Sequence, residues 1–226
     1  MLFNNLKKSK VKYFITPTDN YWHPAVYTDI EKSQPNEVGC PAMKVLSNRL
    51  FNINGLMTLD LKFGQDEYNV PYFEYEFDTK EFQVSKENHK SITDMVHVAS
   101  NNNKASLQHN YGIIFVTDDK DIELTLLGKD GENCYFASGA WNIHSWIRAI
   151  NAAWIIKDVT KPAYVKTKYA EPLVQVLFNK PVDIEQIEPT NDILNYYKYI
   201  KEVSFVKKNI SSLYEIIKKK RPYKLL

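Results

Sequence analysis

The fold is decided by four apolar runs that follow one another between His109 and Phe178: YGIIFV (111–116), DIELTLL (121–127), WIRAINAAWII (146–156) and PLVQVLF (172–178). The first run does not alternate between apolar and polar residues, which is typical of a strand covered on both faces. The second run alternates, as a strand with one wet face does. Together the runs predict a β-rich core, and the turns between them hold the polar and aromatic residues from which a site could be built.

Further strands are predicted upstream of these runs. Apolar residues occupy every second position at 57–63 and again at 73–77, with a turn at 64–67 between them. This pattern predicts a hairpin with one wet face. Residues 10–16 predict a first short strand, and the polar segment 85–104 predicts a long loop with some strand character at 95–98.

Two segments have the spacing of helices. Met43, Leu46 and Leu50 recur at intervals of three and four and predict a short helix between residues 40 and 51. From Pro189 onward, apolar residues recur at the same intervals, which predicts an amphipathic helix that could break near 209–212.

The length of 226 residues suits one domain with an appended element. We expect a β-sandwich domain at 1–188 and a helical extension at 189–226. The apolar stripe of this extension would pack on the sandwich or on a partner subunit, and the second case would give a homo-oligomer. An aromatic content of 13% also favours strands.

Charge and cysteine usage narrow the class of protein. The net charge of +2 is too small to indicate a nucleic-acid partner, although lysines gather near both ends. No apolar run is long enough to span a bilayer, so we expect no membrane contact. Cys40 and Cys134 form no CxxC pair, which favours two reduced thiols in the cytoplasm.

The sequence predicts no catalytic, metal-binding or cofactor-binding residue. The five histidines form no His-x-Asp, His-x-Glu or HExxH pattern, so a metal site is disfavoured. If a metal were bound, His109 and His144 would be the first candidates, because they flank core strands. The carboxylates at 118–123 lack the glycine and terminal glutamate of a calcium loop, and we expect them to be solvated turn residues. Ser138-Gly139 lacks the preceding glycine of a nucleophile elbow.

One polar and aromatic group is a candidate ligand-binding site. Aromatic planes beside a guanidinium and amide donors can stack a nucleobase or hold an anion. Trp146 and Arg148 would share one face of a strand. An ordinary structural role, with core tryptophans and a surface or salt-bridged arginine, remains open. The candidate residues are His109, Tyr111, Trp141, Asn142, His144, Trp146 and Arg148.

Several stretches resemble a family of uncharacterised proteins from tailed bacteriophages of marine and other bacteria. The resemblance covers about two thirds of the chain and ends before the C-terminal helix. It implies a phage origin and a β-sandwich similar to jelly-roll or cupin-like proteins, in which 146–156 is a strand; the pattern of that run alone fits a helix equally well. It implies no activity. The matching stretches are YGIIFV (111–116), the strand closing on Gly128, SGAWN (138–142), WIRAI (146–150), EPLVQV (171–176), CPA (40–42) and Trp22 with Pro24.

Three functions are therefore expected, from different classes. The first is a non-catalytic phage accessory protein that acts in the host cytoplasm and binds a host factor or a small, nucleotide-like or anionic ligand. The second is a structural component of the virion, such as a decoration or tail protein. The third is a cupin-like, metal-dependent enzyme.

Overall fold

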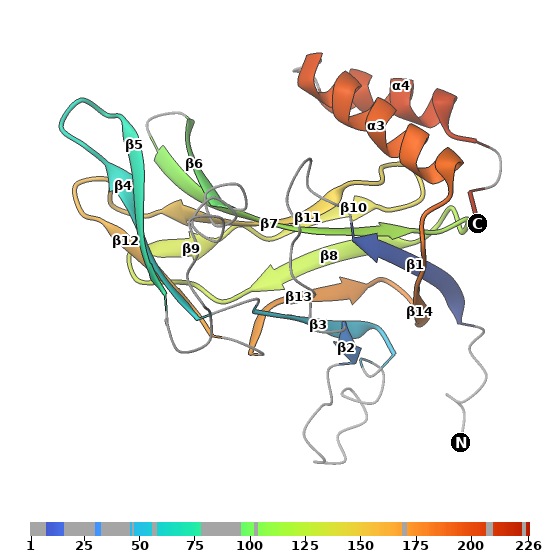
Figure 1. The fold of residues 1–226 in the computed structure, drawn as a ribbon, viewed down its shortest axis with the longest axis horizontal. Helices are drawn as coiled ribbons and strands as arrows, with labels where there is room; N and C mark the ends of the chain where they lie inside the picture. Colours follow the sequence, from blue (N-terminus) through green and yellow to red (C-terminus); the bar gives the residue numbers. More distant parts are fainter. Residues whose placement is uncertain are drawn as a thin grey trace.

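The computed structural model shows a β-sandwich with a third, smaller sheet at one end and two helices at the other (Figure 1). This confirms the mainly β fold predicted from the sequence. The structure describes residues 8–15, 30–32, 46, 48–55, 58–77, 96–101, 104–168, 171–206, 210–222 and 225–226.

The first sheet is built around the long strand β7. It has six strands, and the strand β6 (Val96–Asn101) also pairs with β7 but lies off the main path. All its pairs are antiparallel except β1 with β14, which are parallel, so the sheet is not purely antiparallel. Its main path runs β14 (Val182–Gln186), β1 (Ser9–Ile15), β7 (Lys104–Val116), β11 (Ala149–Ile156) and β9 (Cys134–Phe136).

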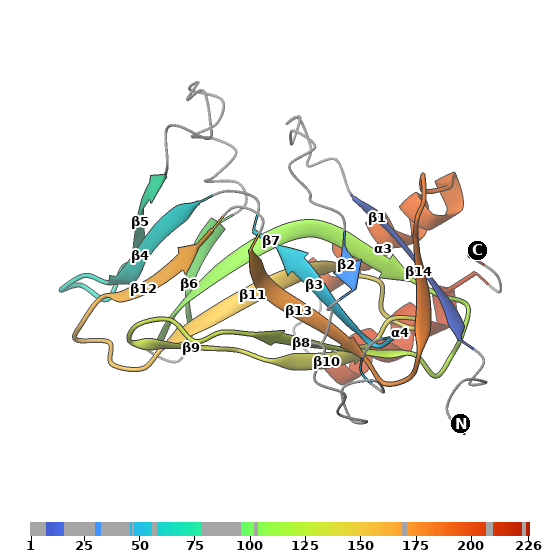
Figure 2. The ribbon, with the colours of Figure 1, turned by 90° about the horizontal axis from the view of Figure 1, so that it is seen from below.

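The second sheet forms the other layer of the sandwich, and a three-stranded sheet closes one end (Figure 2). The second sheet runs β10 (Gly139–Asn142), β8 (Glu123–Gly128), β13 (Pro172–Phe178), β3 (Leu50–Asn54) and β2 (Glu31–Lys32). The three-stranded sheet runs β12 (Ala163–Thr167), β4 (Leu59–Gln65) and β5 (Pro71–Phe77).

The alternating runs form the strands that their patterns predict. β4 and β5 make the expected hairpin, and Leu59, Leu61 and Phe63 are buried on its inner face. In β11 every second residue is buried, so the run at 146–156 is a strand from Ala149 onward. The residues before Ala149 form the connection from β10 instead.

Both faces of β7 are covered near its end, as the run at 111–116 predicts. Ile113 and Phe115 belong to the core between the sheets, whereas Ile114 and Val116 belong to a second cluster under the helices. The strand changes register against β11 beside Gly112, whose φ of 64° is one that glycine adopts without strain.

Two helices supply the cover for the outer face of the first sheet. They are α3 (Asn191–Val206) and α4 (Ile210–Lys220), separated close to where the pattern predicts a break. Their apolar stripes pack on Phe14 of β1 and on Ile114, Val116 and Ile147, so a single chain already buries them. The buried helical residues are Ile193, Tyr196, Ile200, Leu213 and Ile217.

Some local predictions were wrong. Residues 96–98 belong to strand β6, in agreement with the strand character predicted there, but the strand continues to Asn101, where a loop was predicted, because its backbone pairs with β7. Leu50 begins strand β3 and does not belong to a helix. Within the same predicted helix, Leu46 is helical, and Asn48 and Arg49 form a turn. Residues 40–45 and 47 of that helix, and residues 85–95 of the predicted loop, lie outside the described residues.

Candidate binding site

Residues 143–148 carry the chain from β10, at the edge of the second sheet, to β11 in the first. Asn142 closes the turn at their start. Its Oδ1 accepts a hydrogen bond from the backbone N of Ser145 (2.9 Å), and its backbone O accepts one from the backbone N of Trp146 (3.0 Å). Its Nδ2 donates to the backbone O of Lys120 (2.7 Å). Asn142 therefore shapes this connection, and its side-chain amide is engaged within the chain.

Arg148 lies between two tryptophan rings. Its Cζ is 5.4 Å from the ring centroid of Trp141 and 5.2 Å from that of Trp146. Trp141 packs against the core between the sheets, and Trp146 packs against the cluster under the helices. A cation held over a tryptophan face gains about 0.5–1 kcal/mol at an exposed site and more where it is desolvated. We call Trp141, Trp146 and Arg148 the tryptophan clamp.

The clamp brings together three of the predicted site residues, but for a reason other than the predicted one. Trp146 and Arg148 precede β11 and do not share the face of a strand. They meet because the connection from β10 turns back over Trp141, which comes from the other sheet.

Some hydrogen-bond donors in the clamp have no acceptor among the residues that the structure describes. Within the described part of the chain, the Arg148 guanidinium makes no hydrogen bond or ion pair, and the buried Nε1 of Trp141 has no partner. Burial lowers the pKa of Arg148, and the neighbouring Tyr197 of α3 acts in the opposite direction. Arginine nevertheless stays charged at any pH a protein meets. The clamp therefore holds a permanent positive charge for which the described residues supply no counter-ion.

His144 lies in the same connection but contributes its backbone. Its carbonyl oxygen accepts a hydrogen bond from Nε of Arg221 (2.6 Å). Burial, followed by the nearby Arg221 charge, lowers the pKa of its half-buried side chain. Both effects favour the neutral form of the imidazole.

His109 and Tyr111 lie in the core, where a ligand from solvent does not reach them. They are 1% and 0% exposed, and their rings stack at 4.7 Å between centroids. Neither ring nitrogen of His109 has a hydrogen-bond partner among the described residues, and burial lowers its pKa to about 4. These two predicted site residues therefore belong to the interior.

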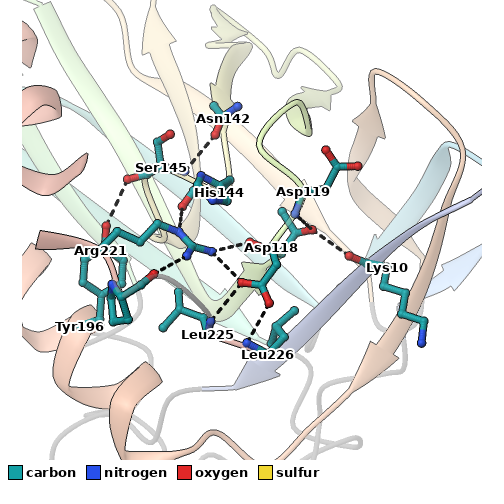
Figure 3. A network of polar contacts seen from close by, with 12 residues as sticks. Lys10, Asp118, Asp119, Asn142, His144, Ser145, Tyr196, Arg221, Leu225 and Leu226 are labelled. Atoms are coloured by element: carbon teal, nitrogen blue, oxygen red, sulfur yellow. Dashed lines mark hydrogen bonds and ion pairs between the residues drawn. The ribbon is translucent and has the colours of Figure 1, made fainter. Parts of the chain in front are cut away.

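A second arginine fixes the connection in place (Figure 3). Arg221, just after α4, donates to the backbone O of His144 and of Thr117 (2.6 Å each) and to Asp118 Oδ1 (3.2 Å). Asp118 also accepts hydrogen bonds from the backbone N of Leu225 (3.0 Å) and of Leu226 (3.1 Å). We call this set the Arg221 latch, and it ties the end of α4 to the clamp's connection.

Two of the carboxylates predicted to be solvated are in fact bonded within the chain. Burial would raise the pKa of Asp118, but the bonds from Leu225, Arg221 and Leu226 outweigh it and hold the pKa below its ordinary value. Asp119 pairs with Lys180 (2.8 Å) and accepts a hydrogen bond from Ser9 (2.6 Å). Against the effect of burial, these contacts lower the pKa of Asp119 to about 2.

A separate cleft of about 810 Å³ lies where the three-stranded sheet meets the β8–β9 turn. Its charged side chains largely neutralise one another in exposed ion pairs, which contribute little to stability. It is lined by Asp60, Leu61, Lys62, Glu74, Tyr75, Glu76, Lys129, Asp130, Gly131, Glu132, Tyr164, Val165, Lys166, Lys168, Glu171, Pro172 and Leu173.

The part of the chain that the structure describes contains no group of three or more His, Cys, Asp or Glu side chains placed to hold a metal ion. His109 and His144 thus gain no further ligands there. Cys134 is a free, buried thiol, and burial raises its pKa to about 11. It is a poor nucleophile at neutral pH because the thiolate is the reactive form.

No protein-family model, curated protein or solved structure matches this chain. The phage resemblance accordingly stays a prediction, as do its jelly-roll and cupin-like details.

Proposed function

We propose that this protein binds an anionic group at the tryptophan clamp without catalysing a reaction. The observation that carries the proposal is the Arg148 guanidinium, which is half-buried between Trp141 and Trp146 and has no acceptor in the described chain. A charge removed from water normally finds a partner within the protein. Here a carboxylate or phosphate from outside the chain would be that partner.

The two rings prepare Arg148 for this role. The guanidinium carbon lies over both rings, 5.4 and 5.2 Å from their centroids, and the guanidinium N–H groups are not bonded within the described chain. The rings also hold a long side chain in one place, which reduces the entropy lost when a ligand binds.

In biological terms, the proposal is a tailed-bacteriophage accessory protein that acts in the host cytoplasm. Its anionic ligand would be a small molecule or a group on a host factor. This proposal depends both on the resemblance of the sequence to phage proteins and on the tryptophan clamp. Neither described helix is long and apolar enough to cross a bilayer.

Calorimetric titration with acetate, inorganic phosphate and adenosine monophosphate at low ionic strength tests the clamp. We expect a dissociation constant of about 1 mM for at least one of these anions, because a single charge-assisted contact supplies only a few kcal/mol. Arg148→Met should abolish the binding heat, and Arg148→Lys should weaken it because lysine lacks the planar fork.

Lys198→Met is the matched control, since it removes one exposed positive charge from α3. Equal binding by the wild type, Arg148→Met and Lys198→Met would refute the proposal. Detection of the protein in purified phage particles by mass spectrometry would instead support a structural role in the virion.

A further inference from the structure

The strand that carries Trp141 has an open edge. β10 ends the second sheet and pairs only with β8 within the described chain. Gly139 and Ala140 are exposed, and a Cβ placed on Gly139 would meet no atom within 4 Å. Exposed edges of this kind are templates for pairing with another strand.

The hydrogen-bond pattern shows which backbone groups face this edge. In an antiparallel ladder, hydrogen-bonded pairs alternate with non-bonded pairs. The backbone N of Ile143 donates to the backbone O of Ile122 (3.1 Å), so Ile143 faces β8. Two residues earlier in the chain, the backbone N–H and C=O of Trp141 also point toward β8. Ala140 therefore directs its N–H and C=O outward, and Asn142 directs its N–H outward.

These outward groups make a short docking edge. The backbone O of Asn142 is occupied by Trp146, but the described chain offers no partner for Ala140 N–H, Ala140 C=O or Asn142 N–H. An antiparallel strand could satisfy both groups of Ala140 with the residue opposite it, and it would end before Asn142, where Trp146 occupies the edge.

We propose that the ligand of the clamp is an extended peptide segment that adds to β10 as a further strand and places a carboxylate against Arg148. Two independent features meet here, because the free edge at Ala140 adjoins Trp141, whose ring contacts the unpaired guanidinium. Main-chain hydrogen bonds supply affinity in strand addition, and a side-chain contact supplies specificity. The inference rests on the proposed function and names its ligand class.

The peptide's carboxylate could belong to an acidic side chain or to its C-terminus, since both match the guanidinium in the same way. Selection of binders from a random peptide library displayed on beads, with the full chain as bait, identifies the peptides. Amidating the C-terminus, or replacing Asp and Glu by Asn and Gln, distinguishes the two sources. Only the replacement that removes the carboxylate in contact with Arg148 should weaken binding to the wild type, and neither should change the residual binding to Arg148→Met.

The decisive variant is Ala140→Pro, which removes the outward N–H, with Ala140→Val as the control that keeps it. Proline is tolerated on an exposed strand edge. We expect Ala140→Pro to bind a selected peptide at least about tenfold more weakly than Ala140→Val in fluorescence anisotropy. Hydrogen exchange at the Ala140 amide of the wild type should slow when the peptide is bound, which tests the same contact without a mutation.

The inference is overturned if no peptide is selected, if Ala140→Pro and Ala140→Val bind alike, or if peptide leaves the Ala140 amide unprotected. Titration with phosphate and acetate shows whether only the strand-addition proposal fails or whether the clamp proposal fails as well. Suppose that the anions bind in a way that depends on Arg148, but that both Ala140 variants bind peptide equally. This result would reject strand addition and leave the clamp proposal intact.

Discussion

Two arginines near the connection 143–148 have opposite surroundings. Arg221 is 4% exposed and meets three backbone carbonyl oxygens and the Asp118 carboxylate. Arg148 is half-buried between two indole rings and meets no acceptor in the described chain. This difference in hydrogen-bond partners shows that an arginine side chain can serve either the fold or a ligand. An arginine that makes four hydrogen bonds within the chain holds the fold together. An arginine whose donors make none within the described chain is suited to binding a ligand.

The comparison predicts its largest effect at Arg221. Arg221→Met should lower the free energy of unfolding by about 3–5 kcal/mol, because it leaves carbonyl groups and Asp118 without their partner. Urea denaturation at pH 7 measures the loss. Lys220→Met removes a neighbouring exposed charge and should change stability by less than about 0.5 kcal/mol. An Arg221→Met protein as stable as this control would contradict the latch.

His109, like Arg148, has no hydrogen-bond partner among the described residues, but it is buried in the core, where no ligand reaches it. Its pKa is about 4 in the folded chain, against an ordinary value of 6.5. Between pH 6.5 and 4, His109 is protonated in the unfolded chain but stays neutral in the folded chain. Stability should therefore fall as the pH drops from 6.5 to 4, by about 3 kcal/mol in total.

His109→Phe should remove most of this slope and leave stability at pH 7 unchanged or higher, because a buried polar group without partners is lost. Urea denaturation at a series of pH values compares the two proteins. A slope that survives the substitution would show that another group causes it.

Asp119 tests whether the loop under the latch depends on its own ion pair. Its folded pKa of about 2 lies below the ordinary 3.8, so its contribution is complete above pH 3.8 and is lost as the pH falls to 2. Asp119→Asn should lower stability at pH 7 by about 1 kcal/mol and flatten the acid transition. Asp121→Asn, at an exposed carboxylate in the same loop, is the control. Equal acid transitions in both variants would contradict the assignment.

The smallest effect is expected at Arg148. Arg148→Met should change the free energy of unfolding by about 1 kcal/mol or less, since the lost contacts with the two rings are offset by release from an unpaired, half-buried charge. Thermal unfolding of the wild type, Arg148→Met and Arg221→Met side by side measures the contrast. A loss at Arg148 equal to the loss at Arg221 would remove the distinction between them.

The strands could be predicted because their information is local. Alternation along 59–63 and 122–126 appears on adjacent residues, and so does the unbroken apolar run at 113–116 that both faces of β7 require. Strand β6 could be predicted only in its first half, where Val96 and Val98 alternate with a polar residue, because pairing of the backbone with β7 defines the rest.

The site could be predicted only in part. Trp146 and Arg148 are neighbours in sequence, but Trp141 joins them through a turn that only the three-dimensional structure shows. The buried position of His109 could have been predicted from the sequence. Leu107, His109 and Tyr111 are alternate residues of one strand, so they lie on the same, inward face.

The latch left no sign in the sequence at all. Asp118 and Arg221 are 103 residues apart, and each occurs among other charged residues that are exposed. The cleft beside the three-stranded sheet is likewise assembled from segments that are distant in the chain.

The most direct test of the clamp compares the two arginines in one protein. Nuclear magnetic resonance of the guanidinium Nε–H groups, recorded during titration with inorganic phosphate or acetate, reports on each side chain separately. Assignment uses Arg148→Met and Arg221→Met. We predict that the Arg148 resonance shifts and exchanges more slowly with water, while the Arg221 resonance stays in place. An Arg148 resonance unmoved by either anion, or a shift equal to that of Arg221, would contradict the claim that the clamp is a binding site.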